Sequence, residues 1–125
     1  MSAILVVEDE PLILSMLALI LKGNGFAVIS ASNGTEAMRK YHVNRRDIHL
    51  VICDADMPAF TGLPAMKQLL EERPDLPILL MSDDPDSAAL NSPPAARFVS
   101  KPFDVSILLS IVRDMVTETN SVSAA

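Results

Sequence analysis

Residues 50–56 read Leu-Val-Ile-Cys-Asp-Ala-Asp, a continuous apolar run that ends in two acidic residues. A strand with one solvated face alternates apolar and polar residues, whereas a strand covered on both faces is apolar throughout. Two further runs, 4–7 (Ile-Leu-Val-Val) and 78–81 (Ile-Leu-Leu-Met), have the same character. Three such runs predict a parallel sheet with helices on both faces.

Less uniform runs at 26–30 and 96–99 complete a set of five predicted strands, and we expect them nearer the sheet edges. Helical patterns fill the gaps between strands. The four clear ones lie at 11–23, 33–43, 63–72 and 105–116. Strand and helix therefore alternate along the chain, which predicts a doubly wound α/β fold.

The segment between the fourth and fifth strands breaks this alternation. Asp84 and Pro85 suit the start of a helix, but Pro93 and Pro94 forbid a helix beyond about Asn91. We therefore expect the fourth helix to be short or irregular.

The composition bounds the function. The 125 residues carry 10 Lys+Arg against 16 Asp+Glu, a net charge of −6. Nucleic-acid affinity comes mainly from neutralising phosphates, so this balance argues against direct nucleic-acid binding. A single cysteine, Cys53, excludes a disulfide framework and suits a reducing compartment. The apolar run 12–21 is too short to span a bilayer, and acidic residues stand where a signal peptide would be basic. We expect a cytoplasmic domain over residues 1–119, with a frayed tail at 120–125 and no membrane insertion.

Side chains with chemistry follow the predicted strands. They are Glu8 and Asp9 after the first, Asp54 and Asp56 after the third, Ser82 after the fourth and Lys101 after the fifth. The carboxyl ends of parallel strands form one rim, where ligands bind in open α/β sheets. Carboxylates gathered there favour a hard divalent cation such as Mg²⁺. A lysine and a hydroxyl suit a phosphoryl group, and a carboxylate in such a site can serve as the nucleophile.

Four pieces of sequence, each at a strand end, resemble one known family. They are Val6-Val7-Glu8-Asp9-Glu10, Asp54-Ala55-Asp56-Met57-Pro58 with Gly62 following, Met81-Ser82, and Lys101-Pro102-Phe103. Together they look like the receiver domain of two-component response regulators, over residues 3 to about 116. The resemblance implies a five-stranded flavodoxin-like sheet in the order 2-1-3-4-5. It also implies a regulatory domain, not an enzyme, that catalyses only its own phosphorylation and dephosphorylation.

The resemblance implies a role for each matching residue. Asp54 corresponds to the phosphate-accepting aspartate, Lys101 to the lysine that pairs with the phosphoryl oxygens, and Ser82 to the switch hydroxyl. Phe98 corresponds to an aromatic residue that changes burial with that hydroxyl, here without a phenolic group. The implied Mg²⁺ ligands are Asp9 directly, Glu8 through water, Asp54, and the backbone carbonyl of Asp56. The Lys101–Pro102 bond is expected to be cis.

The implied partners are a histidine kinase or a phosphotransfer protein as donor, and a downstream protein that the sequence does not identify. With no sequence left for an effector domain, the output would be protein–protein contact or phosphorelay by an apparently stand-alone receiver. The same sequence could also be part of a longer regulator.

Two departures from the family pattern bear on signalling. Lys101 follows Ser82 by only 19 residues, about one helical turn fewer than is usual for receivers. Partner recognition through the fourth helix is therefore expected to differ. Asp83 replaces the usual small residue after the switch hydroxyl, so we hypothesise that it slows phosphorylation by small acyl phosphates more than by a kinase-bound phosphohistidine. Asp84 is a further possible modulator.

Two other functions compete with the phosphorylated switch. Asp54-Ala55-Asp56 after an apolar strand also resembles the start of haloacid-dehalogenase-like phosphatases, with Asp54 as nucleophile and Asp56 as general acid. That scheme leaves Glu8 and Asp9 without a role, and no acidic pair follows Lys101 after a further strand. The other alternative is a degenerate receiver that acts as an unphosphorylated scaffold.

Overall fold

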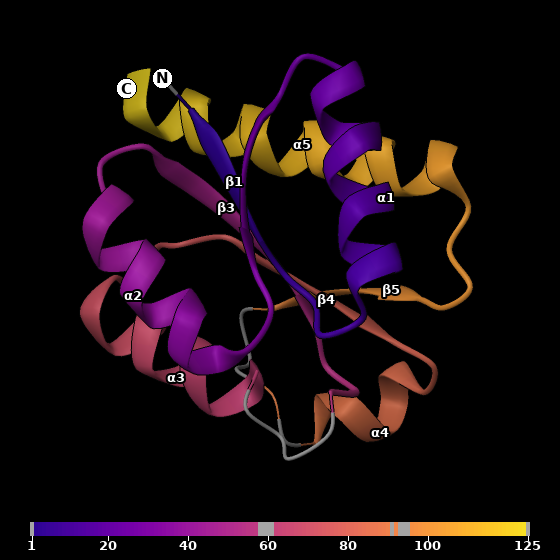
Figure 1. The fold of residues 1–125 in the computed structure, drawn as a ribbon. Coiled ribbons are helices and arrows are strands. Elements are labelled where there is room, and N and C mark those ends of the chain that lie inside the picture. The colour runs from indigo at the N-terminus through magenta and orange to yellow at the C-terminus, as the bar shows by residue number, and fades with distance from the viewer. Residues whose placement is uncertain (1, 58–61, 91, 93–95, 125) are drawn as a thin grey trace.

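The computed structural model describes residues 2–57, 62–90, 92 and 96–124, with side chains in the last helix described through residue 117. Strands and helices alternate along the chain (Figure 1). In chain order they are β1 (Ala3–Val7), α1 (Pro11–Gly23), β2 (Ala27–Ala31), α2 (Gly34–Asn44), β3 (Ile48–Asp54), α3 (Gly62–Glu72), β4 (Ile78–Ser82), α4 (Pro85–Ala89), β5 (Arg97–Ser100) and α5 (Val105–Ala124).

All five strands pair in parallel, in the order β2-β1-β3-β4-β5. The predicted fold class and strand order are therefore confirmed. The central pairs place the ends of neighbouring strands side by side: Val7 pairs with Cys53, and Asp54 pairs with Met81. This register brings the residues that follow β1, β3 and β4 to one edge of the sheet.

Two hydrophobic cores lie on the two faces of the sheet. Leu5 and Val7 of β1 pack into one core with residues of α2 and α3, whereas Ile4 and Val6 pack into the other with residues of α1 and α5. Figure 1 shows these two helix pairs on opposite sides of the sheet. Every residue of β1 is buried, which explains why the strand reads as a continuous apolar run.

Side chains fix the starts of three helices. Asn33 Oδ1 accepts a hydrogen bond from the Glu36 amide at 2.8 Å, and Glu36 Oε1 accepts one from the Ser32 amide at 3.2 Å. Asn33 and Glu36 thus form a capping-box arrangement, with the return bond one residue earlier than the N-cap. Asp104 caps α5 in the same way, through the amides of residues 106 and 107. The third cap is that of Asp84 on α4.

The sequence predicts the extent of α4 but not the end of α5. α4 is short as expected, with five residues and no buried side chain; Asn91, Pro93 and Pro94, which bear on that expectation, lie outside the described residues. α5 continues past Val116, where the sequence predicts its end, through Ala124. Neither glycine nor proline occurs after residue 104, so no residue there breaks the helix. The boundary between a domain at 1–119 and a tail at 120–125 stays a prediction.

No helix in the described part of the chain is both long enough and apolar enough to cross a membrane.

Candidate functional site

Asp54, the last residue of β3, is more deeply enclosed than Asp56 in the loop that follows. It is 4% exposed, and its Oδ1 atom accepts hydrogen bonds from Lys101 Nζ at 2.7 Å and from the Asp56 amide at 2.8 Å. Burial raises the pKa of the Asp54 carboxyl, but hydrogen bonds from the Glu8 carboxyl and the Lys101 ammonium outweigh burial and hold the pKa below its ordinary value. Asp54 is therefore an ionised carboxylate in a nearly closed pocket.

Glu8 is enclosed beside Asp54, at the end of β1. Its side chain is 1% exposed, and Oε2 has no hydrogen-bond partner among the described residues. Burial first, then the hydrogen bond and the negative charge of Asp54, raise the pKa of Glu8 to about 8. A neutral Glu8 beside an ionised Asp54 is the state that this pocket favours without a cation.

An oxygen-seeking cation fits this cluster. One carboxylate oxygen from each of Glu8, Asp9 and Asp54 lies within 4.8 Å of the other two. Asp9 is partly exposed, so the cluster opens to solvent on its side. The unpartnered Oε2 of Glu8 and the mutual repulsion of the carboxylates would both be relieved by a hard divalent ion, which takes oxygen ligands. The described residues thus match the donor set that Mg²⁺ requires.

Lys101 supplies the positive charge of the rim. Its side chain is 22% exposed and pairs with Asp54 at 2.7 Å and with Asp56 at 3.5 Å. Desolvation lowers the pKa of Lys101, but the hydrogen bond and the charge of Asp54 raise it more, so that the ammonium stays protonated. The peptide bond between Lys101 and Pro102 is cis.

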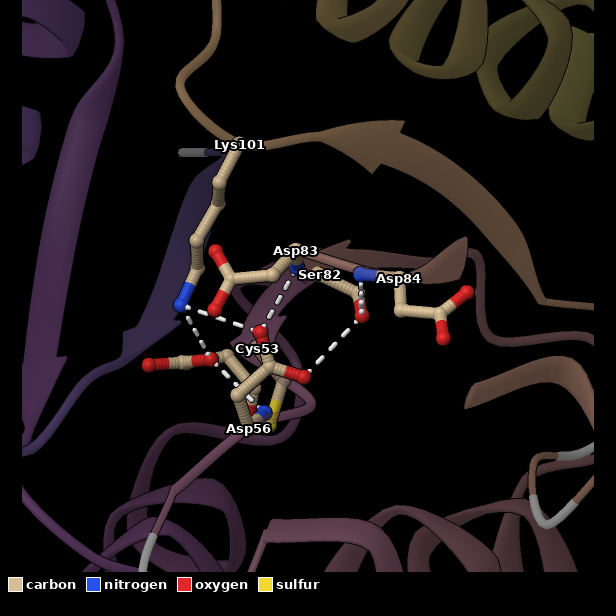
Figure 2. Close-up of polar contacts among 7 residues, drawn as sticks. Cys53, Asp56, Ser82, Asp83, Asp84 and Lys101 are labelled. Carbon is tan, nitrogen blue, oxygen red and sulfur yellow. Dashed lines mark hydrogen bonds and ion pairs between the residues drawn. The ribbon is translucent and has the colours of Figure 1, made fainter. Parts of the chain in front are cut away.

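Ser82 lies at the end of β4, fully buried, and its hydroxyl contacts Asp56. Ser82 Oγ donates to Asp56 Oδ1 at 3.0 Å and accepts a hydrogen bond from the Asp84 amide at 3.0 Å. The Asp83 amide donates to Asp56 Oδ2 at 2.7 Å, while the Asp83 side chain is exposed. Figure 2 shows the Asp56 carboxylate between Lys101 and the Ser82–Asp84 segment.

The contacts of the Asp56 side chain were not predicted from the sequence, because the resemblance to receivers assigns this residue only a backbone carbonyl. The sequence did contain one indication of these contacts. Asp56 comes two residues after the end of β3, and β3 is the neighbour of β4 in the sheet. That position places Asp56 near the end of β4, but the direction of its side chain depends on the conformation of the loop after β3.

Two other residues border the site. Phe98 on β5 is half-buried and packs against the core under α2 and α3. Cys53 is fully buried, and burial followed by the charge of Asp54 raises the pKa of its thiol well above the ordinary value. Thiol reactivity requires the thiolate, so Cys53 is an inert core residue.

A family model for the response regulator receiver domain matches residues 4–113. The chain is a member of this family. The transcriptional regulatory protein GlrR of Escherichia coli (strain K12) is 28% identical over 119 residues, which cover 93% of this chain and 26% of GlrR. The chain therefore spans about a quarter of the length of that relative.

Solved structures agree with the family assignment. A response regulator receiver domain protein from Clostridium thermocellum has a TM-score of 0.88 at 26% identity, over 98% of this chain and 99% of the other. The response regulator TrrA from Thermotoga maritima, solved with Mg²⁺-BeF, has a TM-score of 0.77 at 29% identity, over 92% and 99%. Receivers are phosphorylation-dependent regulatory switches that bind Mg²⁺ at an acidic pocket. Family membership favours this function over the phosphatase alternative.

Proposed function

We propose that this receiver accepts a phosphoryl group on Asp54 from a histidine kinase or a phosphotransfer protein. The observation that carries the proposal is the Asp54 carboxylate, ionised and nearly buried, with Lys101 Nζ 2.7 Å from its Oδ1 atom. A carboxyl group acts as a nucleophile in its deprotonated form, and the lowered pKa of Asp54 favours that form. The lysine supplies positive charge where the incoming phosphoryl oxygens would lie.

Glu8, Asp9, Asp54 and the backbone carbonyl of Asp56 are the proposed Mg²⁺ ligands, Glu8 through water. When bound, Mg²⁺ supplies positive charge that neutralises phosphoryl oxygens. In the reaction, an Asp54 oxygen forms a bond to phosphorus while the bond from phosphorus to the donor nitrogen breaks. The electron pair of the broken bond stays on the donor imidazole. Lys101 keeps its proton and stabilises the charge on the transferred group.

Phosphorylation would change the surface through Ser82. An acyl phosphate on Asp54 brings nearly two negative charges to one point. Ser82, which now donates to Asp56, would turn toward the phosphoryl group and draw the start of α4 with it. Phe98, half-buried on β5, would change its burial with that movement. The switch is then a shift between two existing conformations, and hydrolysis of the acyl phosphate resets it.

An apolar groove beside the rim suits a phosphodonor protein. Its volume is about 410 Å³, and it is lined by Ile13, Met16, Met81, Asp83, Lys101, Pro102, Phe103 and Val105. The exposed side chains of Leu12 and Leu19 extend the apolar face along α1. A donor must bring its phosphohistidine to Asp54, and this groove is continuous with the rim through Lys101. We therefore assign it to the donor rather than to the downstream protein.

The downstream partner would recognise a surface that differs from the usual receiver. The α4 helix has only five residues, so a partner that recognises a full fourth helix has little to contact here. The predictions of a cytoplasmic location and of a stand-alone receiver both stay predictions.

The test is the intact mass of the protein after incubation with acetyl phosphate and Mg²⁺. We expect the wild type to gain one phosphoryl group and Asp54→Asn to gain none. A wild type that gains no phosphoryl group from acetyl phosphate, or from any histidine kinase of the same organism, would support the scaffold alternative instead. Turnover of a generic phosphate monoester would support the phosphatase alternative.

A further inference from the structure

The Asp56 carboxylate holds three groups of the rim. Its Oδ1 atom accepts a hydrogen bond from Ser82 Oγ at 3.0 Å, and its Oδ2 atom accepts one from the Asp83 amide at 2.7 Å. Lys101 Nζ lies 3.5 Å from Oδ2. The Asp56 side chain is 31% exposed, so solvent weakens the ion pair, whereas the two hydrogen bonds set the orientation of the carboxylate.

These partners are the kind of groups that bind a phosphoryl oxygen: a hydroxyl, a backbone amide and an ammonium. Two of them, Ser82 and Lys101, are the residues that the proposed function assigns to the phosphoryl group on Asp54. We propose that Asp56 is a resident anion, which holds the phosphoryl-binding donors in the unphosphorylated protein and is displaced when a phosphoryl group arrives. This inference rests on the proposed function, and it makes Asp56 a positioning residue.

Displacement of the Asp56 carboxylate would change the contacts that hold the start of α4. Ser82 Oγ, which donates to Asp56, also accepts from the Asp84 amide, and Asp84 caps α4 through the Ser87 amide at 3.2 Å. The Asp83 amide is tied to the same carboxylate. Although Ala88 packs against the core, no side chain of α4 is fully buried, so these polar contacts help to hold its first turn. The exchange of one anion for another therefore connects the phosphorylation site to the surface of α4.

Competition makes a prediction that a purely structural loop contact does not. If Asp56 only stabilised the loop, its removal would loosen the site and weaken anion binding. If Asp56 competes with the phosphoryl group, removal of its charge strengthens anion binding. Asp56→Asn keeps the size of the side chain and its acceptor oxygen but removes the charge, and it leaves the backbone carbonyl in place.

The test uses beryllofluoride as a phosphoryl mimic, titrated at saturating Mg²⁺ and followed by amide NMR. We expect Asp56→Asn to bind beryllofluoride roughly three- to tenfold more tightly than the wild type. Asp86→Asn is the control for net charge, since Asp86 lies in the first turn of α4, and its affinity should equal that of the wild type. Equal or weaker binding by Asp56→Asn would overturn the inference.

A second measurement needs neither Mg²⁺ nor beryllofluoride. In Asp56→Ala, the Asp83 amide loses its acceptor, so we expect its proton resonance to move upfield and its hydrogen exchange to accelerate, while amides of β1 keep their protection. Unchanged Asp83 resonance and exchange would overturn the inference even if the wild type bound no beryllofluoride. A wild type that failed to bind the mimic, with the Asp83 amide shifted as expected, would count against the proposed function alone.

Discussion

A methyl group added at Gly62 would collide with the segment that carries the phosphorylation site. A Cβ atom there would lie 2.6 Å from Met57 Cε, 2.9 Å from Cys53 Sγ and 3.1 Å from the Asp54 carbonyl oxygen, all closer than the ordinary contact distance of 3.4–4 Å. Met57 Cε ends a flexible side chain and moves at little cost. The Cys53 sulfur is fully buried, and the Asp54 oxygen belongs to the backbone, so neither yields without strain.

We therefore expect Gly62→Ala to lower the free energy of unfolding by about 2 kcal/mol, within the range for overpacked cores. For a domain of this size, the melting temperature would fall by roughly 8 °C. Urea denaturation and a thermal melt measure the two quantities. Because the clash displaces Asp54 itself, phosphorylation by acetyl phosphate should also slow at temperatures where the variant is fully folded.

Gly23→Ala is the matched control, with the same chemical change at the last residue of α1. Apart from its chain neighbours and the backbone of α1, no atom of the described residues lies within 4 Å of a Cβ built there, so the alanine meets open space. Alanine reduces the entropy of the unfolded chain and favours the helix, so stability should rise by about 0.5 kcal/mol or slightly more. A Gly62→Ala variant as stable as the wild type, or an equal loss of stability in both variants, would show that the close contacts at Gly62 do not destabilise the fold.

Three further predictions test the rim and its approaches. Mg²⁺ at about a hundred times its Kd should stabilise the wild type by about 2.7 kcal/mol in thermal melts at constant ionic strength, and Asp9→Asn should lose most of this gain; an equal gain in Asp9→Asn would contradict the assigned ligand. Asp83→Ala should raise the rate with acetyl phosphate by about two- to threefold, because an exposed negative charge beside the rim is removed; an unchanged rate would show that Asp83 has no such effect. Met16→Glu should reduce phosphotransfer from the histidine kinases of the same organism but not phosphorylation by acetyl phosphate. Val43→Glu, at an exposed position on α2, should reduce neither reaction. Loss of phosphotransfer in both variants, or in neither, would argue against the groove as the donor surface.

The central strands of the sheet were predictable because buried strands consist almost entirely of apolar residues. The runs at 4–7, 50–53 and 78–81 are apolar throughout, and the structure buries each of them on both faces. The end of α5 was not predictable in the same way. Its last residues are small and polar, as in a linker, and the absence of a helix breaker is a weaker signal than the presence of one.

The candidate site was likewise predictable only in part. Parallel strands bring their carboxyl ends to one rim, so Glu8, Asp54 and Lys101 could be grouped from their positions in the sequence alone. Spacing does not show which way a loop side chain points. The bond from Ser82 to Asp56 therefore emerged only with the structure, since it depends on the path of the chain after β3.

Chemical trapping of the acyl phosphate shows directly whether Asp54 carries the phosphoryl group. Reduction of the phosphorylated protein with borohydride converts a phosphorylated aspartate into homoserine, and peptide mass spectrometry locates that residue. We expect homoserine at position 54 and at no other position. Homoserine at position 9 or 56, or a phosphoryl group found on a histidine, would contradict it.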